Sequence, residues 1–241
     1  MRLVLVHGFT QSPASWDGVR RHLEGAVEGG LEVVTPEVPD GLDFAATARA
    51  VAEGGGAAVY GGYSMGGRIC LRAALERPDL VRGLVLVSAS PGLADGDARA
   101  RRRQRDTELA GEIGRLGVPA FVRRWLAQPL FSTLQAGEDE VDRRAEATTV
   151  ERLVHQLVVL GQGVQEPLWD RLDELAVPVA VMSGRADAAY DAIGDAMAAA
   201  VADCVRVRVE GGHALPLEQP AAVAGALLDV VRRVARHEPT P

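Results

Sequence analysis

Residues 62–68 read Gly-Tyr-Ser-Met-Gly-Gly-Arg and contain the pattern Gly-x-Ser-x-Gly. A short apolar run precedes them, and residues 69–77 have helical character and stop at Pro78. On a sharp turn from strand to helix, a serine is strained and exposed, and flanking glycines leave room for the turn. An ordinary glycine-rich turn is the alternative. The strand before the pattern and the helix after it favour a nucleophile elbow, with Ser64 as nucleophile.

Apolar runs that suit buried strands alternate with helical segments along most of the chain. The predicted strands are residues 3–6, 31–35, 57–61, 83–88, 177–183 and 205–209. Such alternation requires crossover connections and predicts an α/β fold, with a mostly parallel, doubly wound sheet covered on both faces. The length of 241 residues fits one large domain of this kind with an insertion.

The insertion is expected between residues 91 and 163, where strand-like runs disappear and arginines cluster at residues 99–105. We predict that residues 1–90 and 164–241 form the core and that residues 91–163 form a helical cap. Most arginines of the cluster are expected on a solvated helix face. The alternative is that one or two turn inward as carboxylate receptors, for which the planar guanidinium is suited.

Composition excludes several classes of protein. The net charge of −7 argues against a general nucleic-acid binder. Cys70 and Cys204 form no disulfide framework, which indicates a reducing compartment. The first residues enter a strand directly, and no apolar run is long enough for a signal peptide or a bilayer span. We therefore expect a cytoplasmic protein with neither membrane nor nucleic acid as a partner.

Ser64, Asp187 and His213 occur in this order, each after a predicted strand, where open α/β sheets place their sites. In a triad, His213 takes the proton of Ser64, while Asp187 fixes the tautomer of the histidine. Taken singly, the aspartate suits a turn or helix cap and the histidine a surface loop. The joint arrangement favours a triad. Asp191 and Asp195 are weaker candidates for the acid, because they fall inside the following helix.

The loop His7-Gly8-Phe9 follows the first strand and would complete such a site. Backbone N–H groups of Phe9 and Met65 are the expected oxyanion-hole donors. We expect His7 itself to be structural and to hydrogen-bond the backbone. The sequence contains no Cys/His cluster, no acidic pair with ligand spacing and no phosphate-binding glycine motif, so we predict no metal and no cofactor.

With these motifs the chain resembles proteins of the α/β-hydrolase fold. More narrowly, it resembles the 2-succinyl-6-hydroxy-2,4-cyclohexadiene-1-carboxylate synthase (MenH) family of menaquinone biosynthesis. The segments that carry this likeness are residues 7–9 with Trp16, 62–68, 102–106, 121–125, 129–131 and 165–169. The resemblance implies a cofactor-independent lyase that eliminates pyruvate from a succinylated enolpyruvyl-cyclohexene carboxylate, a small anionic molecule.

The resemblance also implies residue roles. Ser64, held by the other two triad members, would act as a base on the substrate ring. Tyr63 and Arg68 would line the pocket beside the elbow, and Arg102 and Trp125 would reach in from the cap. Several fixed cations suit a polyanionic substrate.

The chain departs from the family pattern at two places. Ala188-Ala189-Tyr190 stands where the family commonly has a Lys-Phe pair, and a further cap arginine of the family corresponds to Arg143 or Arg144.

Two other functions compete with the lyase. A carboxylic-ester or carbon–carbon bond hydrolase would use Ser64 to form an acyl-enzyme, and an apolar cap pocket would favour it. An arginine-lined pocket would favour the lyase. The third function is that of a binding protein that has lost turnover, and the intact triad argues against it.

Overall fold

The computed structural model describes residues 1–27 and 30–237. Residues 28, 29 and 238–241 belong to the segments predicted as core and lie outside the described residues. Six strands form one parallel sheet in the order β2-β1-β3-β4-β5-β6. The strands are β1 (Arg2–Val6), β2 (Glu32–Val34), β3 (Ala58–Tyr63), β4 (Val81–Val87), β5 (Val179–Gly184) and β6 (Cys204–Val209). Each predicted strand is present, and the α/β fold with a parallel sheet is confirmed.

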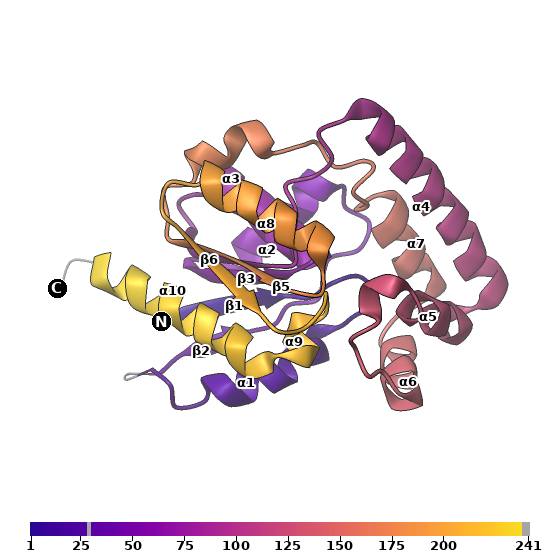
Figure 1. The fold of residues 1–241 in the computed structure, drawn as a ribbon, viewed down its shortest axis with the longest axis horizontal. Helices are drawn as coiled ribbons and strands as arrows, with labels where there is room; N and C mark the ends of the chain where they lie inside the picture. Colours follow the sequence, from indigo (N-terminus) through magenta and orange to yellow (C-terminus); the bar gives the residue numbers. More distant parts are fainter. Residues whose placement is uncertain (28–29, 238–241) are drawn as a thin grey trace.

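Helices cover both faces of this sheet (Figure 1), which explains why its central strands are continuously apolar. One face carries α2 (Phe44–Gly55), α3 (Met65–Glu76) and α8 (Ala188–Ala200), and the other carries α1 (Asp17–Leu23) and α10 (Pro220–His237). Ile69 is fully buried under the first layer and Trp16 under the second. The short helix α9 (Leu215–Glu218) precedes α10. Three 3₁₀ helices span Pro13–Trp16, Pro129–Phe131 and Trp169–Glu174.

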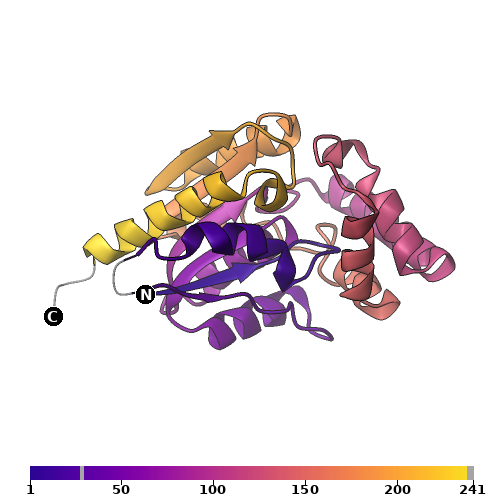
Figure 2. The same cartoon turned by 90° about the horizontal axis from the view of Figure 1, so that it is seen from below.

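Four further helices lie between β4 and β5 in the chain: α4 (Gly96–Leu116), α5 (Val118–Leu126), α6 (Glu138–Glu146) and α7 (Val150–Val158). They stand together at one end of the molecule in both views (Figures 1 and 2). The apolar faces of α4, α5 and α7 share a small cluster, formed by Ile113, Phe121, Leu153 and Leu157. The predicted helical character of residues 91–163 is confirmed, while their division from the core as a cap stays a prediction.

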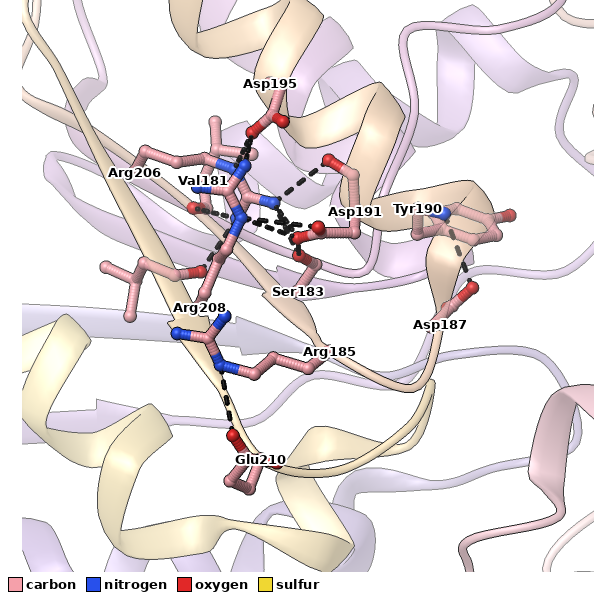
Figure 3. Close-up of polar contacts among 11 residues, drawn as sticks. Val181, Ser183, Arg185, Asp187, Tyr190, Asp191, Asp195, Arg206, Arg208 and Glu210 are labelled. Carbon is pink, nitrogen blue, oxygen red and sulfur yellow. Dashed lines mark hydrogen bonds and ion pairs between the residues drawn. The ribbon is translucent and has the colours of Figure 1, made fainter.

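A charged network fastens α8 to the edge strand β6 (Figure 3). Arg206 donates to the side chain of Asp191 at 2.5 Å and to Ser183 Oγ at 2.6 Å. Its side chain is only 12% exposed, because it packs against Gly194 of α8. The network therefore fixes the start of α8 relative to β5 and β6.

The turn between β3 and α3 has the geometry of an elbow. Ser64 has φ of +51°, a left-handed conformation that costs an L-residue energy. The backbones approach so closely that a Cβ on Gly66 would lie 2.1 Å from the carbonyl oxygen of Val6. A Cβ on Gly62 would lie 2.4 Å from the carbonyl oxygen of Gly66. Glycine is therefore required at both positions for α3 to pack against β1 and β3.

No helix within residues 1–27 and 30–237 combines the length and the apolar composition needed to cross a membrane.

Gly66→Ala is expected to lower the free energy of unfolding by about 3 kcal/mol, since neighbouring backbone cannot move away from the new methyl group. Urea denaturation followed by circular dichroism measures this change. Gly225→Ala is the matched control, because nothing lies within 4 Å of its added Cβ in the middle of α10. The control should be as stable as the parent or slightly more stable. Equal stability of the two variants would show that the elbow tolerates a side chain.

Candidate active site

Three side chains meet at the carboxyl edge of the sheet in hydrogen-bonding order. His213 Nδ1 lies 2.6 Å from Asp187 Oδ2, and His213 Nε2 lies 3.1 Å from Ser64 Oγ. A carboxylate accepts only, so Nδ1 carries the proton and Nε2 is free to accept one from the serine. The arrangement can raise the nucleophilicity or basicity of the Ser64 oxygen.

Asp187 has two roles at the end of β5. Its Oδ1 accepts from the backbone N–H of Tyr190 at 3.3 Å and caps α8, while Oδ2 faces His213. The helix-cap alternative from the sequence is therefore correct as well, and it orients the carboxylate toward the histidine.

The loop that carries His213 is held by a residue that sequence reasoning missed. Glu218 accepts hydrogen bonds from the backbone N–H groups of Gly212 at 2.7 Å and Ala214 at 2.9 Å. These two bonds clamp the loop on both sides of the imidazole, which is 2% exposed. The glutamate five residues after the histidine, at the end of α9, was the available signal.

The two weaker candidates for the acid are engaged elsewhere. Asp191 accepts from Ser183, Arg206 and Arg208, and Asp195 pairs with the same two arginines (Figure 3). Both carboxylates belong to the α8–β6 network, and neither contacts His213 in the hydrogen bonds of the described residues.

The loop after β1 lies beside the elbow. His7 Nδ1 lies 2.9 Å from the carbonyl oxygen of Gly8, and the backbone N–H of Val38 donates to His7 Nε2 at 3.4 Å. The prediction that His7 is structural and bonds the backbone is thus confirmed. Phe9 and Met65, the predicted oxyanion-hole residues, both line the pocket next to Ser64.

A cavity of about 270 Å³ opens over Ser64. Every predicted site residue except Asp187 lines it, and Asp187 lies behind His213. The lining that the sequence predicted comprises Phe9, Tyr63, Ser64, Met65, Arg68, Arg102, Trp125 and His213. The cavity is bounded by the sheet edge on one side and by residues of α4, α5 and α7 on the other.

Three arginines line this cavity and bring positive charge to it: Arg68, Arg102 and Arg105. Arg68 is 5% exposed and donates to Gln165 Oε1 at 2.8 Å, with its guanidinium 5.5 Å from the ring centroid of Phe44. Burial lowers the pKa of Arg68 to about 10, which still leaves it charged at neutral pH. On α4, Arg102 donates to Asp106 and to Gln162, both at 2.8 Å.

Several lining residues that touch these arginines or the histidine were not identified from the sequence. Asp106 is 2% exposed, and burial raises the pKa of its carboxyl in spite of the neighbouring Arg102. Gln162 lies in the loop after α7, and Tyr190 lies in the first turn of α8. The sequence did not indicate that these polar side chains point into the cavity, although residues 102–106 carry part of the family likeness.

The structure separates the two candidates for the further cap arginine. Arg143 pairs with Glu140 on the exposed side of α6. Arg144 is 4% exposed and donates to Thr10 Oγ1 at 2.8 Å, beside the loop after β1. Burial lowers the pKa of Arg144 to about 10. Within the described residues its Nη2 is buried without a hydrogen-bond partner.

Aromatic rings that pack against one another line the cavity. The Trp125 ring lies 4.9 Å from that of Phe9 and 6.1 Å from that of Phe131, and Phe131 packs edge-on to His213 at 5.9 Å. The cavity thus offers apolar surface for a ring together with cations for carboxylates. Over residues 1–27 and 30–237, no three His, Cys, Asp or Glu side chains are grouped so that they could hold a metal ion.

Comparison with known proteins identifies relatives of this chain. The model of the alpha/beta hydrolase family matches residues 3–226. A protein of Salmonella paratyphi B, named 2-succinyl-6-hydroxy-2,4-cyclohexadiene-1-carboxylate synthase, is 30% identical over 71% of this chain and 67% of its own length. A Bacillus subtilis protein with the same name, given as a provisional assignment, is 35% identical over 66% of this chain. That match spans 60% of the Bacillus protein, less than two thirds of its length.

Solved structures show the same fold. MenH from S. aureus superposes with a TM-score of 0.88 at 21% identity, covering 98% of this chain and 94% of that chain. A thermophilic esterase from Thermogutta terrifontis, with malate bound, superposes with a TM-score of 0.77 at 24% identity, covering 97% and 90%.

Asp106→Asn should change how stability depends on pH. A raised pKa means that the folded protein binds a proton more readily than the unfolded chain, so parent stability falls as pH rises above the ordinary aspartate range of about 4. The asparagine variant lacks this loss and should gain stability relative to the parent between pH 4 and pH 7. Urea denaturation at both pH values measures the difference. Asp173→Asn, an exposed control, should follow the parent, and parallel behaviour of both variants would contradict the effect of burial.

Proposed function

This chain belongs to the alpha/beta hydrolase family, and on that premise we propose that it is a cofactor-independent lyase of menaquinone biosynthesis. Its substrate would be a succinylated enolpyruvyl-hydroxycyclohexene carboxylate, from which it eliminates pyruvate. One observation carries the proposal: a serine hydroxyl bonded to a histidine shares its cavity with the guanidinium groups of Arg68 and Arg102. The synthase name of the Salmonella and Bacillus relatives supports the same reaction.

In this reaction the oxygen of Ser64 acts as a base. His213 holds the hydroxyl proton, and Ser64 Oγ takes a proton from the ring carbon beside the succinyl carbonyl. The electrons of that C–H bond enter the ring system, a new double bond forms, and the ring carbon–oxygen bond to the enolpyruvyl group breaks. Pyruvate leaves as its enolate and takes up the proton held by His213, which returns the triad to its starting protonation state. Asp187 stabilises the imidazolium while His213 holds the proton.

Negative charge develops on the succinyl carbonyl oxygen as the ring proton is removed. The backbone N–H groups of Phe9 and Met65 are proposed to receive it, since both residues line the cavity together with Ser64. The positive end of α3 adds to this stabilisation, because the helix begins at Met65.

The arginines would bind the carboxylates of the substrate, and Tyr63 and Trp125 would confine its ring. Arg68 is fixed by Gln165 and Arg102 by Asp106, so each presents its remaining N–H groups without losing much freedom on binding.

Ester hydrolysis through an acyl-enzyme is the competing reaction. The arginines that line the cavity favour the lyase over a hydrolase of apolar esters. The hydrogen-bonded triad favours an enzyme over a binding protein.

We also propose a cytoplasmic location and no nucleic-acid partner, from the cysteine content and the net charge of −7. Residues 91–163 are proposed to form a cap over the sheet edge, because they contain helices and no strands among the described elements.

Ser64→Ala should reduce pyruvate release from the enolpyruvyl substrate by about 10³-fold or more in kcat, because the base is removed while the pocket remains. A coupled lactate dehydrogenase assay measures the pyruvate. Ser132→Ala, which changes an exposed serine, is the control and should keep parent activity. Retained activity in the Ser64 variant would rule out this serine as the base. Rapid turnover of nitrophenyl esters by the parent, without pyruvate release, would identify the hydrolase instead.

Arg102→Met should raise KM for the same substrate roughly 10- to 100-fold, because a charge-assisted hydrogen bond to a carboxylate is lost. Steady-state kinetics over a wide substrate range measure KM and kcat separately. Arg101→Met is the matched control on the same helix, where the side chain is 73% exposed and lies 3.9 Å from Asp95. An equal rise in KM for both variants would indicate general attraction by the basic helix, and no rise for either would remove Arg102 from the binding site.

A further inference from the structure

Tyr190 contacts two members of the triad and one residue that holds Arg102. Its backbone N–H donates to Asp187 Oδ1 (Figure 3), and its ring packs edge-on to the His213 ring with 4.5 Å between centroids. Its hydroxyl extends to the other side of the cavity and accepts a hydrogen bond from Gln162 Nε2 at 3.1 Å. A single side chain thus joins the start of α8 to the loop that follows α7.

The direction of the Gln162 amide follows from its neighbours. A guanidinium only donates, so the atom that faces Arg102 Nη1 at 2.8 Å must be the amide oxygen. The amide nitrogen then points the opposite way and donates to the hydroxyl of Tyr190 and to Ser90 Oγ at 3.2 Å. Two acceptors for the two amide protons hold Gln162 in one orientation, and the glutamine is 8% exposed.

Arg102 is consequently fixed at two points. Asp106 accepts from its Nε, and Gln162 accepts from its Nη1. Its side chain is 33% exposed, so without the second contact the guanidinium could turn toward solvent. The remaining N–H groups of the fork are those available to a ligand in the cavity.

We infer that the hydroxyl of Tyr190 is a positioning group that acts through Gln162 to hold Arg102 toward the carboxylate of the substrate. The inference rests on the proposed function for the identity of that carboxylate. The Tyr190 hydroxyl bonds Gln162, and the Gln162 amide oxygen bonds Arg102. Neither group takes part in the proposed proton transfer between Ser64 and His213. Their effect should therefore fall on substrate affinity and leave the chemical step unchanged.

Tyr190→Phe tests the hydroxyl alone, because the ring stays against His213. We expect KM to rise about 3- to 10-fold, with kcat within about twofold of the parent. Gln162→Ala should raise KM by at least as much. In the double variant, Tyr190→Phe should add less than about twofold, since the two residues act in one chain of bonds.

Tyr60→Phe is the matched control. The Tyr60 hydroxyl bonds the backbone oxygens of Ala52 and Gly56 outside the cavity, so its loss should affect stability and leave KM unchanged. A full effect of Tyr190→Phe in the Gln162→Ala background would mean that the hydroxyl contacts substrate directly, and it would overturn the inference. A fall in kcat at constant KM would overturn it too, because the hydroxyl would then act on His213.

A crystal structure of the Tyr190→Phe protein tests the inference without any assay of activity. We expect the Gln162 amide to turn and its contact with Arg102 Nη1 to lengthen beyond hydrogen-bonding distance. A contact that stays at 2.8 Å would overturn the positioning role even if the enzyme is a lyase. Absence of pyruvate release by the parent would reject the proposed function. The crystal structure would still show whether the Tyr190 hydroxyl is needed for the contact between Gln162 and Arg102.

Discussion

The hydrogen bond between His213 and Asp187 joins two loops that follow different strands, and the chemistry proposed for this chain depends on it. At 2.6 Å it sets the proton on Nδ1, which leaves Nε2 to face Ser64. Contacts elsewhere at the sheet edge hold the two loops in place. Glu218 binds the backbone on both sides of His213, and the Arg206 network fixes the start of α8. A catalytic bond between loops thus receives its precision from backbone and ion-pair contacts outside the cavity.

The cavity is lined by positively charged side chains, although the chain as a whole is negatively charged. The chain carries a net charge of −7, yet the cavity contains Arg68 and Arg102, and Arg144 is buried nearby. Burial lowers the pKa of Arg68 and Arg144 to about 10 and so removes part of the preference for the charged form, but both remain cations at neutral pH. In our proposal, an anionic substrate that binds to Arg68 would recover part of this desolvation cost.

The departure from the family pattern at residues 188–190 has a structural consequence. Tyr190 ends this segment, and its hydroxyl accepts a hydrogen bond from Gln162 Nε2. The site therefore joins α8 to the α7 loop through polar contacts that a phenylalanine could not make. In our proposal, the hydroxyl at this position restricts the orientation of Arg102 through Gln162.

The sequence by itself determined the elements and their order. The alternation of apolar runs predicted six strands, and all six are found. The four central strands are buried and need nearly continuous apolar residues, whereas the edge strands β2 and β6 are only partly buried. Gly62 and Gly66 marked the elbow, since only glycine permits that close approach. The order of Ser64, Asp187 and His213 after strand ends was equally readable from the chain.

Only the tertiary structure decided which polar side chains point into the cavity. Arg143 and Arg144 are adjacent and chemically identical, but the helix turns one outward and buries the other beside Thr10. Gln162 and Tyr190 are distant in sequence and meet through a single hydrogen bond. Hydrophobic periodicity fixes which face of an element is buried, whereas the direction of a polar side chain depends on partners that folding brings from elsewhere in the chain.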